Sequence, residues 1–182
     1  MTNAACPSMC AAIAGGTEWN RLMKIITIED AKAMVGKEIG VSEWRTVTQT
    51  MIDLFADATD DHQFIHTDPE RAARESPYGG TIAHGFLTLS LLSAMIFEAV
   101  PRLQGASVGV NFGFDKIRFT NVVRTGSRIR ARFVLSDLKV RPSGIIESAY
   151  DVSVEIENNA KPALTARWLT LAMPDRNENG ES

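Results

Sequence analysis

The chain has little of several features that would decide its class at once. It holds two cysteines, Cys6 and Cys10, and carries a formal net charge of −3. Two cysteines in an unpatterned N-terminal stretch do not form a disulfide framework, so we expect a reducing, cytoplasmic setting. The small negative charge gives no field that would attract nucleic acid or an acidic membrane surface. No window approaches the roughly 18 uninterrupted apolar residues that a membrane span needs.

Length and composition predict one soluble domain with short flanking segments. The 182 residues are 45% hydrophobic and 23% charged, which is ordinary for a globular protein. Residues 1–22 lack periodicity and contain no basic residue before Arg21, so we expect a disordered N-terminal extension rather than a signal peptide. The domain is expected over residues 23–173, followed by a flexible C-terminal tail over 174–182.

Hydrophobic periodicity predicts helices in the first half of the chain and strands in the second. Helices are expected at 28–35, 50–58, 69–74 and 84–99, and the last is apolar nearly all round and therefore expected to be buried. Strands are expected at 39–48, 107–112, 114–119, 127–139, 145–157 and 161–172. Short turns between the later strands imply antiparallel pairing. One long buried helix and a long antiparallel sheet predict an α+β fold in which the sheet wraps the helix.

All three histidines of the chain, His62, His66 and His84, fall between positions 62 and 84. Histidine titrates nearest neutrality and is the usual proton-transfer group, so this grouping beside Asp61 predicts that the chemistry happens here. His62 and His66 also have the spacing of two metal ligands on one helix face. Because Gln63 stands where the zinc-protease pattern has glutamate, we expect no metal.

Two motifs in this segment resemble those of a known family. The run Asp-His-Gln-Phe-Ile-His over residues 61–66, followed by Ile-Ala-His-Gly over 82–85, resembles the MaoC-like, or R-specific enoyl-CoA hydratase, family and its nodulation protein N-like subgroup. The family usually has Asn and Pro where this chain has Gln and Phe. The resemblance spans about residues 40–172. It implies a single hot-dog domain that forms a homodimer, with the acyl-thioester site near the dimer interface.

The resemblance implies reversible addition of water to a trans-2-enoyl thioester. Asp61 and His66 would form the catalytic pair and hold one water between them. Backbone N–H groups where the apolar helix begins would bind the thioester oxygen, since a helix start offers unpaired donors. The candidate substrate-binding residues are His84, Gly85, Gln63 and Gly80. The expected substrate carrier is coenzyme A or an acyl-carrier protein, and no metal or redox cofactor is expected.

Basic residues gather between positions 116 and 141, and arginine and lysine suit the phosphates of a thioester carrier. Lys116 and Arg118 are the candidate phosphate contacts. Arg128, Arg130 and Arg132 alternate with apolar residues, which equally fits the solvated face of a strand. No aromatic pattern accompanies these residues, so no nucleic-acid partner is expected.

Two other functions fit the same residues. A hot-dog thioesterase would use Asp61 or His66 to activate water against the thioester carbonyl. A non-catalytic acyl-thioester-binding module would keep the fold without turnover, and the Gln63 and Phe64 departures leave room for it. Since fold alone does not decide function, all three remain open until the site is placed.

Overall fold

One antiparallel sheet forms the body of the protein. The computed structural model describes residues 24–175; the expected N-terminal extension, both cysteines and most of the expected C-terminal tail lie outside this range. The sheet has the order β2-β6-β7-β8-β5, with β3 paired to β6. Its strands are β2 (Glu38–Val41), β3 (Arg45–Thr46), β5 (Ala106–Phe119), β6 (Arg128–Val140), β7 (Ile146–Ile156) and β8 (Leu164–Pro174). A separate parallel pair joins β1 (Ile25–Ile26) to β4 (Arg102–Leu103).

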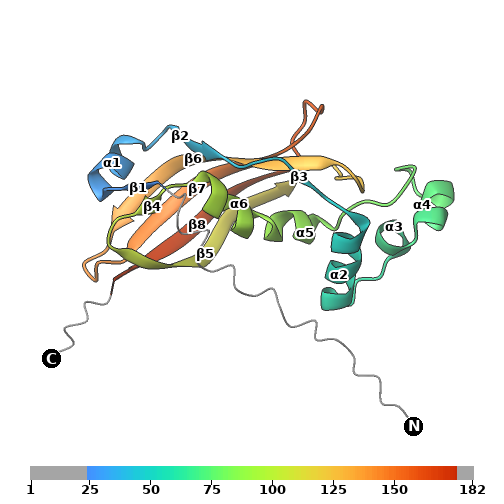
Figure 1. The fold of residues 1–182 in the computed structure, drawn as a ribbon, viewed down its shortest axis with the longest axis horizontal. Coiled ribbons are helices and arrows are strands. Elements are labelled where there is room, and N and C mark those ends of the chain that lie inside the picture. The colour runs from blue at the N-terminus through green and yellow to red at the C-terminus, as the bar shows by residue number, and fades with distance from the viewer. Residues whose placement is uncertain (1–23, 176–182) are drawn as a thin grey trace, which may run out of the picture.

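Six helices lie within the described residues. They are α1 (Ile28–Ala33), α2 (Gln49–Thr59), α3 (Phe64–Thr67), α4 (Pro69–Glu75), α5 (Gly85–Ser90) and α6 (Leu92–Ala99). Figure 1 shows α6 over the sheet, with α2, α3 and α4 grouped at one end of the molecule. None of the helices in the described part is long and apolar enough to cross a membrane.

Side-chain caps explain where several of these helices begin. Thr27 and Asp30 form a reciprocal capping box at the start of α1. The Asp68 side chain accepts from the Arg71 N–H at the start of α4, with Pro69 at the first helical position. These helix starts were predicted from the sequence and are confirmed. The short helix α3 was not predicted.

The helical segment after His84 differs from the prediction in two respects. It breaks at Leu91 into α5 and α6, and the Ser90 hydroxyl donates to the Phe86 carbonyl at 2.8 Å just before the break. Such back-bonding bends helices. The prediction of burial all round was wrong, because Phe86 is 66% exposed and Phe97 56% exposed. The face toward the sheet is buried through Leu87, Leu92 and Met95.

Two strand predictions also change. The expected strands at 107–112 and 114–119 form the single strand β5, which shifts register between Asn111 and Gly113. A bulge of this kind bends a strand without ending it. The expected strand at 39–48 divides into β2 and β3. Between them Ser42 bonds the main chain of Ala131 through both its N–H and its hydroxyl, which interrupts the ladder.

The sheet buries one face and exposes the other to water. On β6 the buried positions Ile129, Ala131, Phe133 and Leu135 alternate with the three arginines of the strand. Those arginines pair with glutamates: Arg128 with Glu157, Arg130 with Glu155, and Arg132 with Glu38 and Glu155. They therefore belong to an ion-paired solvent face.

Candidate active site

The end of α2 delivers Asp61 to the site. Asp60 adopts a left-handed backbone conformation with φ 58°, which ends the helix and turns the chain. The Asp61 main-chain carbonyl then accepts a hydrogen bond from His84 Nε2 at 3.0 Å, while its carboxylate Oδ2 lies 4.0 Å from the same nitrogen. The Asp61 side chain is 54% exposed. The main chain is thus anchored, and the carboxylate is open to water or a ligand.

His66 is held by a carbonyl oxygen from another segment. Its ring is buried, and Nδ1 lies 2.7 Å from the Ile82 carbonyl oxygen. A carbonyl can only accept, so Nδ1 carries the proton and Nε2 of the neutral ring keeps its lone pair. Burial lowers the pKa of His66 below its ordinary value, with the neighbouring His84 ring adding to this, against opposing effects of the Ile82 hydrogen bond and of Asp61. His66 is therefore a neutral base at physiological pH.

His84 stacks on His66 at the start of α5. The two ring centroids are 3.8 Å apart at an interplanar angle of 27°, and Phe55 packs against His84 at 5.1 Å. His84 Nε2 donates to the Asp61 carbonyl, and its buried Nδ1 has no hydrogen-bond partner among the described residues. Substrate binding by His84 stays a prediction.

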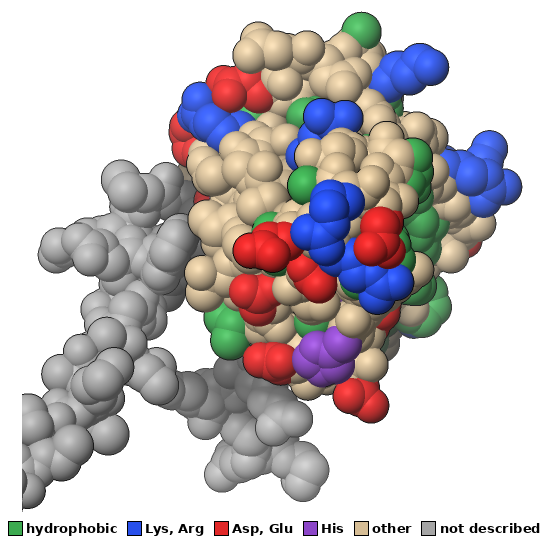
Figure 2. All heavy atoms as spheres, turned by 90° about the vertical axis from the view of Figure 1, so that its right-hand side faces the viewer, with side chains coloured by type: hydrophobic (Ala, Val, Ile, Leu, Met, Phe, Trp, Pro, Cys, Tyr) green, Lys and Arg blue, Asp and Glu red, His purple; other side chains and the backbone are tan. Residues whose placement is uncertain are grey.

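Asp61, His66 and His84 form one cluster. One side-chain nitrogen or oxygen of each lies within 4.8 Å of the others. The His62–His66 pair that the spacing suggested as metal ligands does not form, because the half-exposed His62 ring lies instead 3.9 Å from Asp57 and 3.8 Å from Asp60. That end of the molecule shows acidic and basic side chains mixed together (Figure 2). The absence of a metal from the cluster stays a prediction.

Gly85 allows two parts of the fold to meet beside the histidines. A Cβ at this position would lie 3.0 Å from the Phe119 ring at the end of β5. The Phe119 ring also packs edge-on against Phe86, with centroids 5.8 Å apart. Glycine thus permits close approach at the first turn of α5, where backbone N–H groups have no intrahelical acceptor.

Gln63 and Gly80, two further predicted substrate-binding residues, are not members of this cluster. Gln63 is exposed and occupies the N-cap position directly before α3, three residues before His66. Gly80 follows the left-handed Gly79 in a turn, and its carbonyl accepts from the Ser76 hydroxyl at 3.4 Å. Substrate contact by Gln63 and Gly80 stays a prediction.

Lys116 and Arg118 lie on β5, opposite Arg167 and Thr165 of β8. They alternate with Ile117, which packs against the core. Strand alternation therefore directs Lys116 and Arg118 to the face of the sheet opposite the core, so phosphates bound there would approach from the solvent side.

Sequence reasoning missed Gln49 at the first turn of α2. Its Nε2 donates to the His66 carbonyl and to Asp53 Oδ1, each at 2.7 Å. Its Oε1 accepts from the hydroxyls of Thr81 at 2.6 Å and Thr125 at 3.1 Å. The only sequence signal nearby is the capping residue Thr48, which predicts a helix start but no contact with the site.

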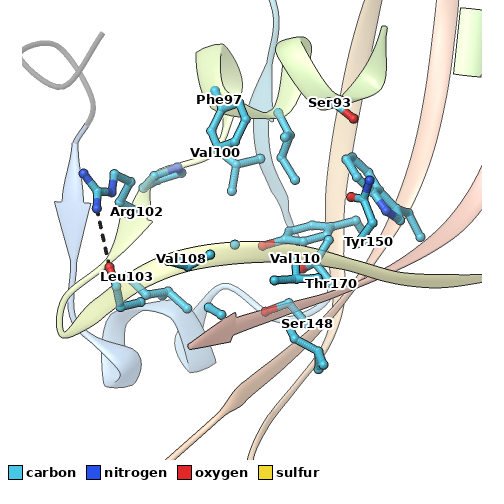
Figure 3. Close-up of a pocket in the computed structure, with 18 of the residues that line it drawn as sticks. Ser93, Phe97, Val100, Arg102, Leu103, Val108, Val110, Ser148, Tyr150 and Thr170 are labelled. Carbon is cyan, nitrogen blue, oxygen red and sulfur yellow. Dashed lines mark hydrogen bonds between the residues drawn. The ribbon is translucent and has the colours of Figure 1, made fainter. Parts of the chain in front are cut away.

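A cavity of about 580 Å³ lies between α6 and the sheet, where β4 and β5 also border it (Figure 3). Its lining is mainly apolar, with Ile96 and Phe97 from α6 and Tyr150 and Trp168 from the sheet. Ser93 also faces it, eight residues beyond Gly85 along the same helical segment. A largely apolar cavity is the common form of a small-molecule site, and none of Asp61, His66 and His84 lines this one.

Comparison with known proteins identifies the family of this chain. Residues 30–158 match the MaoC like domain. The chain belongs to the MaoC-like dehydratase family. It is 57% identical over 150 residues to nodulation protein N of Rhizobium meliloti (strain 1021), covering 82% of this chain and 93% of that protein.

Two further relatives of this MaoC-like protein bear on its fold and chemistry. It is 43% identical over 140 residues to 3-hydroxyacyl-thioester dehydratase Z of Mycobacterium tuberculosis, covering 77% of this chain and 91% of that protein. The unliganded R-hydratase of Pseudomonas aeruginosa superposes with a TM-score of 0.59 at 23% identity, covering 78% and 83% of the two chains. At that identity the likeness concerns the fold, and it confirms the predicted hot-dog domain.

Proposed function

We propose that this MaoC-like protein is an (R)-specific enoyl-thioester hydratase, which also runs in reverse as a 3-hydroxyacyl-thioester dehydratase. The observation that carries the proposal is the buried, neutral His66, one ring nitrogen of which lies within 4.8 Å of an Asp61 carboxylate oxygen. A lone pair and a carboxylate placed together can hold a water by hydrogen bonds and exchange protons with it. The mycobacterial relative, a 3-hydroxyacyl-thioester dehydratase, supports the same reaction class.

In the proposed hydration, the water oxygen forms a bond to C3 of the enoyl thioester. His66 Nε2 takes a proton from that water, and Asp61 orients the water. The π electrons of the C2–C3 bond move toward the thioester carbonyl, whose oxygen gains negative charge. N–H groups at the first turn of α5, near Gly85, stabilise this oxygen. A proton from the Asp61–His66 pair then reaches C2, so that the elements of one water are added and neither metal nor redox cofactor is required.

The cavity beside α6 is the proposed place for the acyl chain. Its aliphatic and aromatic lining suits a hydrocarbon, because burying apolar surface contributes about 25 cal/mol per Å². The helical segment that begins at Gly85 reaches the cavity at Ser93, so the thioester and the chain would lie along one element. The thioester carrier, coenzyme A or an acyl-carrier protein in the cytoplasm, would remain outside.

The protein is further proposed to act as a homodimer. β5 is an edge strand of the sheet and exposes Val108, Val110 and Phe112, while Phe97 of α6 is also exposed. An exposed apolar edge strand favours pairing with another chain. A second copy of the protein would cover this surface.

The test of the proposed reaction is the loss of enoyl-thioester absorbance when the purified protein meets crotonyl-CoA or a longer trans-2-enoyl-CoA. We expect turnover without release of free thiol, and its loss in Asp61→Asn and His66→Ala. His62→Ala serves as the matched control, because His62 lies outside the cluster. Thiol release would identify a thioesterase instead.

A non-catalytic acyl-thioester-binding module is the second candidate, since the nodulation protein N relatives carry no reaction in their names. Acyl-CoA binding by folded protein without turnover at any chain length would favour it. Phe64 stands where the family usually has proline, and its contacts in the structure favour the catalytic alternative. Phe64 packs beneath the Arg71 guanidinium, 4.1 Å from the ring centroid, so the aromatic residue is accommodated against α4 while His66 keeps its hydrogen bond.

A further inference from the structure

We infer that Gln49 is a positioning residue that fixes the orientation and tautomer of His66. The inference rests on the proposed hydratase for its catalytic consequence. Gln49 lies 17 positions before His66 in the chain, yet its side chain donates to the His66 main-chain oxygen at 2.7 Å. None of its four hydrogen bonds involves the imidazole ring, so an effect on catalysis would pass through the placement of His66.

The Gln49 amide uses all four of its main hydrogen-bonding directions. Nε2 donates twice, to the His66 carbonyl and the Asp53 carboxylate, and Oε1 accepts twice, from Thr81 and Thr125. The two threonine hydroxyls are themselves 2.8 Å apart. A fully satisfied, part-buried polar network holds its members in a defined geometry.

The Gln49 amide joins the segment that carries His66 to the segment that carries the hydrogen-bond acceptor of His66. Thr81 directly precedes Ile82, whose carbonyl accepts the proton on His66 Nδ1. Gln49 therefore holds the main chain of His66 with one end of its amide, and with the other end it holds the segment that supplies the acceptor of His66. Because a carbonyl at Nδ1 keeps the lone pair on Nε2, loss of this alignment would let the ring adopt the other tautomer.

Gln49→Met removes the four hydrogen bonds while keeping the length of the side chain. We expect kcat to fall about 10²-fold with little change in KM, as for an ångström-scale misplacement of a catalytic group. Asp53→Asn keeps an oxygen for Nε2 and is expected to change kcat less than threefold. Gln104→Met, at an exposed glutamine in the turn after β4, provides the control for the substitution itself.

If Gln49→Met does not fold, two other variants test the donor and acceptor ends of the Gln49 amide separately. Gln49→Glu keeps oxygens that can accept from Thr81 and Thr125 but, when ionised, cannot donate to the His66 carbonyl. Thr125→Val removes one hydroxyl from the opposite side. We expect the glutamate variant to lose most of the activity and Thr125→Val to lose less.

Nitrogen-15 NMR of the histidine rings tests the inference without turnover, and single variants assign the three histidines. In the wild-type protein we expect the His66 Nδ1–H tautomer alone; in Gln49→Met or Gln49→Glu we expect a mixture of tautomers. Unchanged His66 signals in a folded Gln49 variant would overturn the inference. Absence of turnover in the wild-type protein would overturn the proposed reaction, while the NMR signals would still decide the role of Gln49.

Discussion

The two ends of the helical segment that follows His84 differ in the contacts that they make and in the surface that they expose. At its start, the histidine cluster is held within one chain by hydrogen bonds to main-chain carbonyls, with Gln49 joining the segments. At its far end, α6 and β5 leave Phe97, Val108 and Val110 exposed around an apolar cavity. The hydrogen bonds of the polar end form within a single copy, whereas the apolar end exposes hydrophobic surface to water.

In the proposed reaction, the chemistry and the substrate chain place separate demands on the fold. Proton transfer needs groups fixed to within a fraction of an ångström, which directional hydrogen bonds supply. A hydrocarbon chain needs only shape and apolar contact, which are non-directional. Changes at the polar end should therefore alter kcat, and changes at the apolar end should alter assembly or chain-length preference.

Alanine substitutions of the three histidines should lower kcat to different extents, most of all at His66. His66→Ala should lower kcat by about 10²–10⁴-fold, the usual contribution of a general base. His84→Ala should cost less, since in the proposed reaction His84 anchors Asp61 and stacks on His66 without accepting the proton. His62→Ala should leave kcat unchanged. Steady-state hydration rates check this order, and an equal loss in His62→Ala would contradict the placement of the cluster.

A second prediction concerns the packing of α6 on the sheet. A Cβ at Gly40 of β2 would lie 1.9 Å from the Ala99 carbonyl oxygen at the end of α6. Gly40→Ala should therefore lower the free energy of unfolding by about 1–3 kcal/mol, the usual cost of overpacking. The matched control is Gly109→Ala in β5, where a Cβ has no neighbour within 4 Å. Urea unfolding should show a lower midpoint for Gly40→Ala alone.

A charge on the edge strand tests the apolar end. Val110→Glu should weaken the proposed dimer by roughly tenfold or more, because it would bury an unpaired carboxylate in the interface. Sedimentation at several protein concentrations measures the change, with Lys161→Glu in the exposed turn before β8 as the control. A wild-type protein that stays monomeric at all concentrations would contradict the dimer.

The smallest expected effect is a pH dependence of stability that comes from His66. Burial lowers the pKa of His66 in the folded protein, so the unfolded chain takes up its proton first as the pH falls. The free energy of unfolding should therefore decrease as the pH drops below the unfolded value of about 6.5, until the folded pKa is passed. His66→Gln should reduce this decrease, and His62→Gln should not. Thermal unfolding between pH 7.5 and 5.5 measures it.

The parts of this molecule that could be predicted from the sequence are those with local causes. Caps and turn residues set the helix starts at Thr27 and Asp68, and alternation predicted the later strands. The 61–66 and 82–85 motifs identified the members of the cluster, although their roles in catalysis stay predictions.

The features that the sequence did not predict depend on contacts between segments that are distant in the chain. Gln49 meets His66, Thr81 and Thr125 only after the chain has folded, so no local pattern marks it. The exposure of Phe86 and Phe97 was missed for a related reason. An apolar residue has the same sequence signature whether it faces the core or a surface left for another molecule.

The left-handed Asp60 that ends α2 has an electrostatic consequence. Together with Asp57 and Asp61 it places three carboxylates at the C-terminal end of a helix, where the macrodipole already has its negative pole. Salt screens repulsion among exposed charges, so moderate ionic strength should steady this stretch. The order of the segment that carries Asp61 should therefore respond to the ions around it.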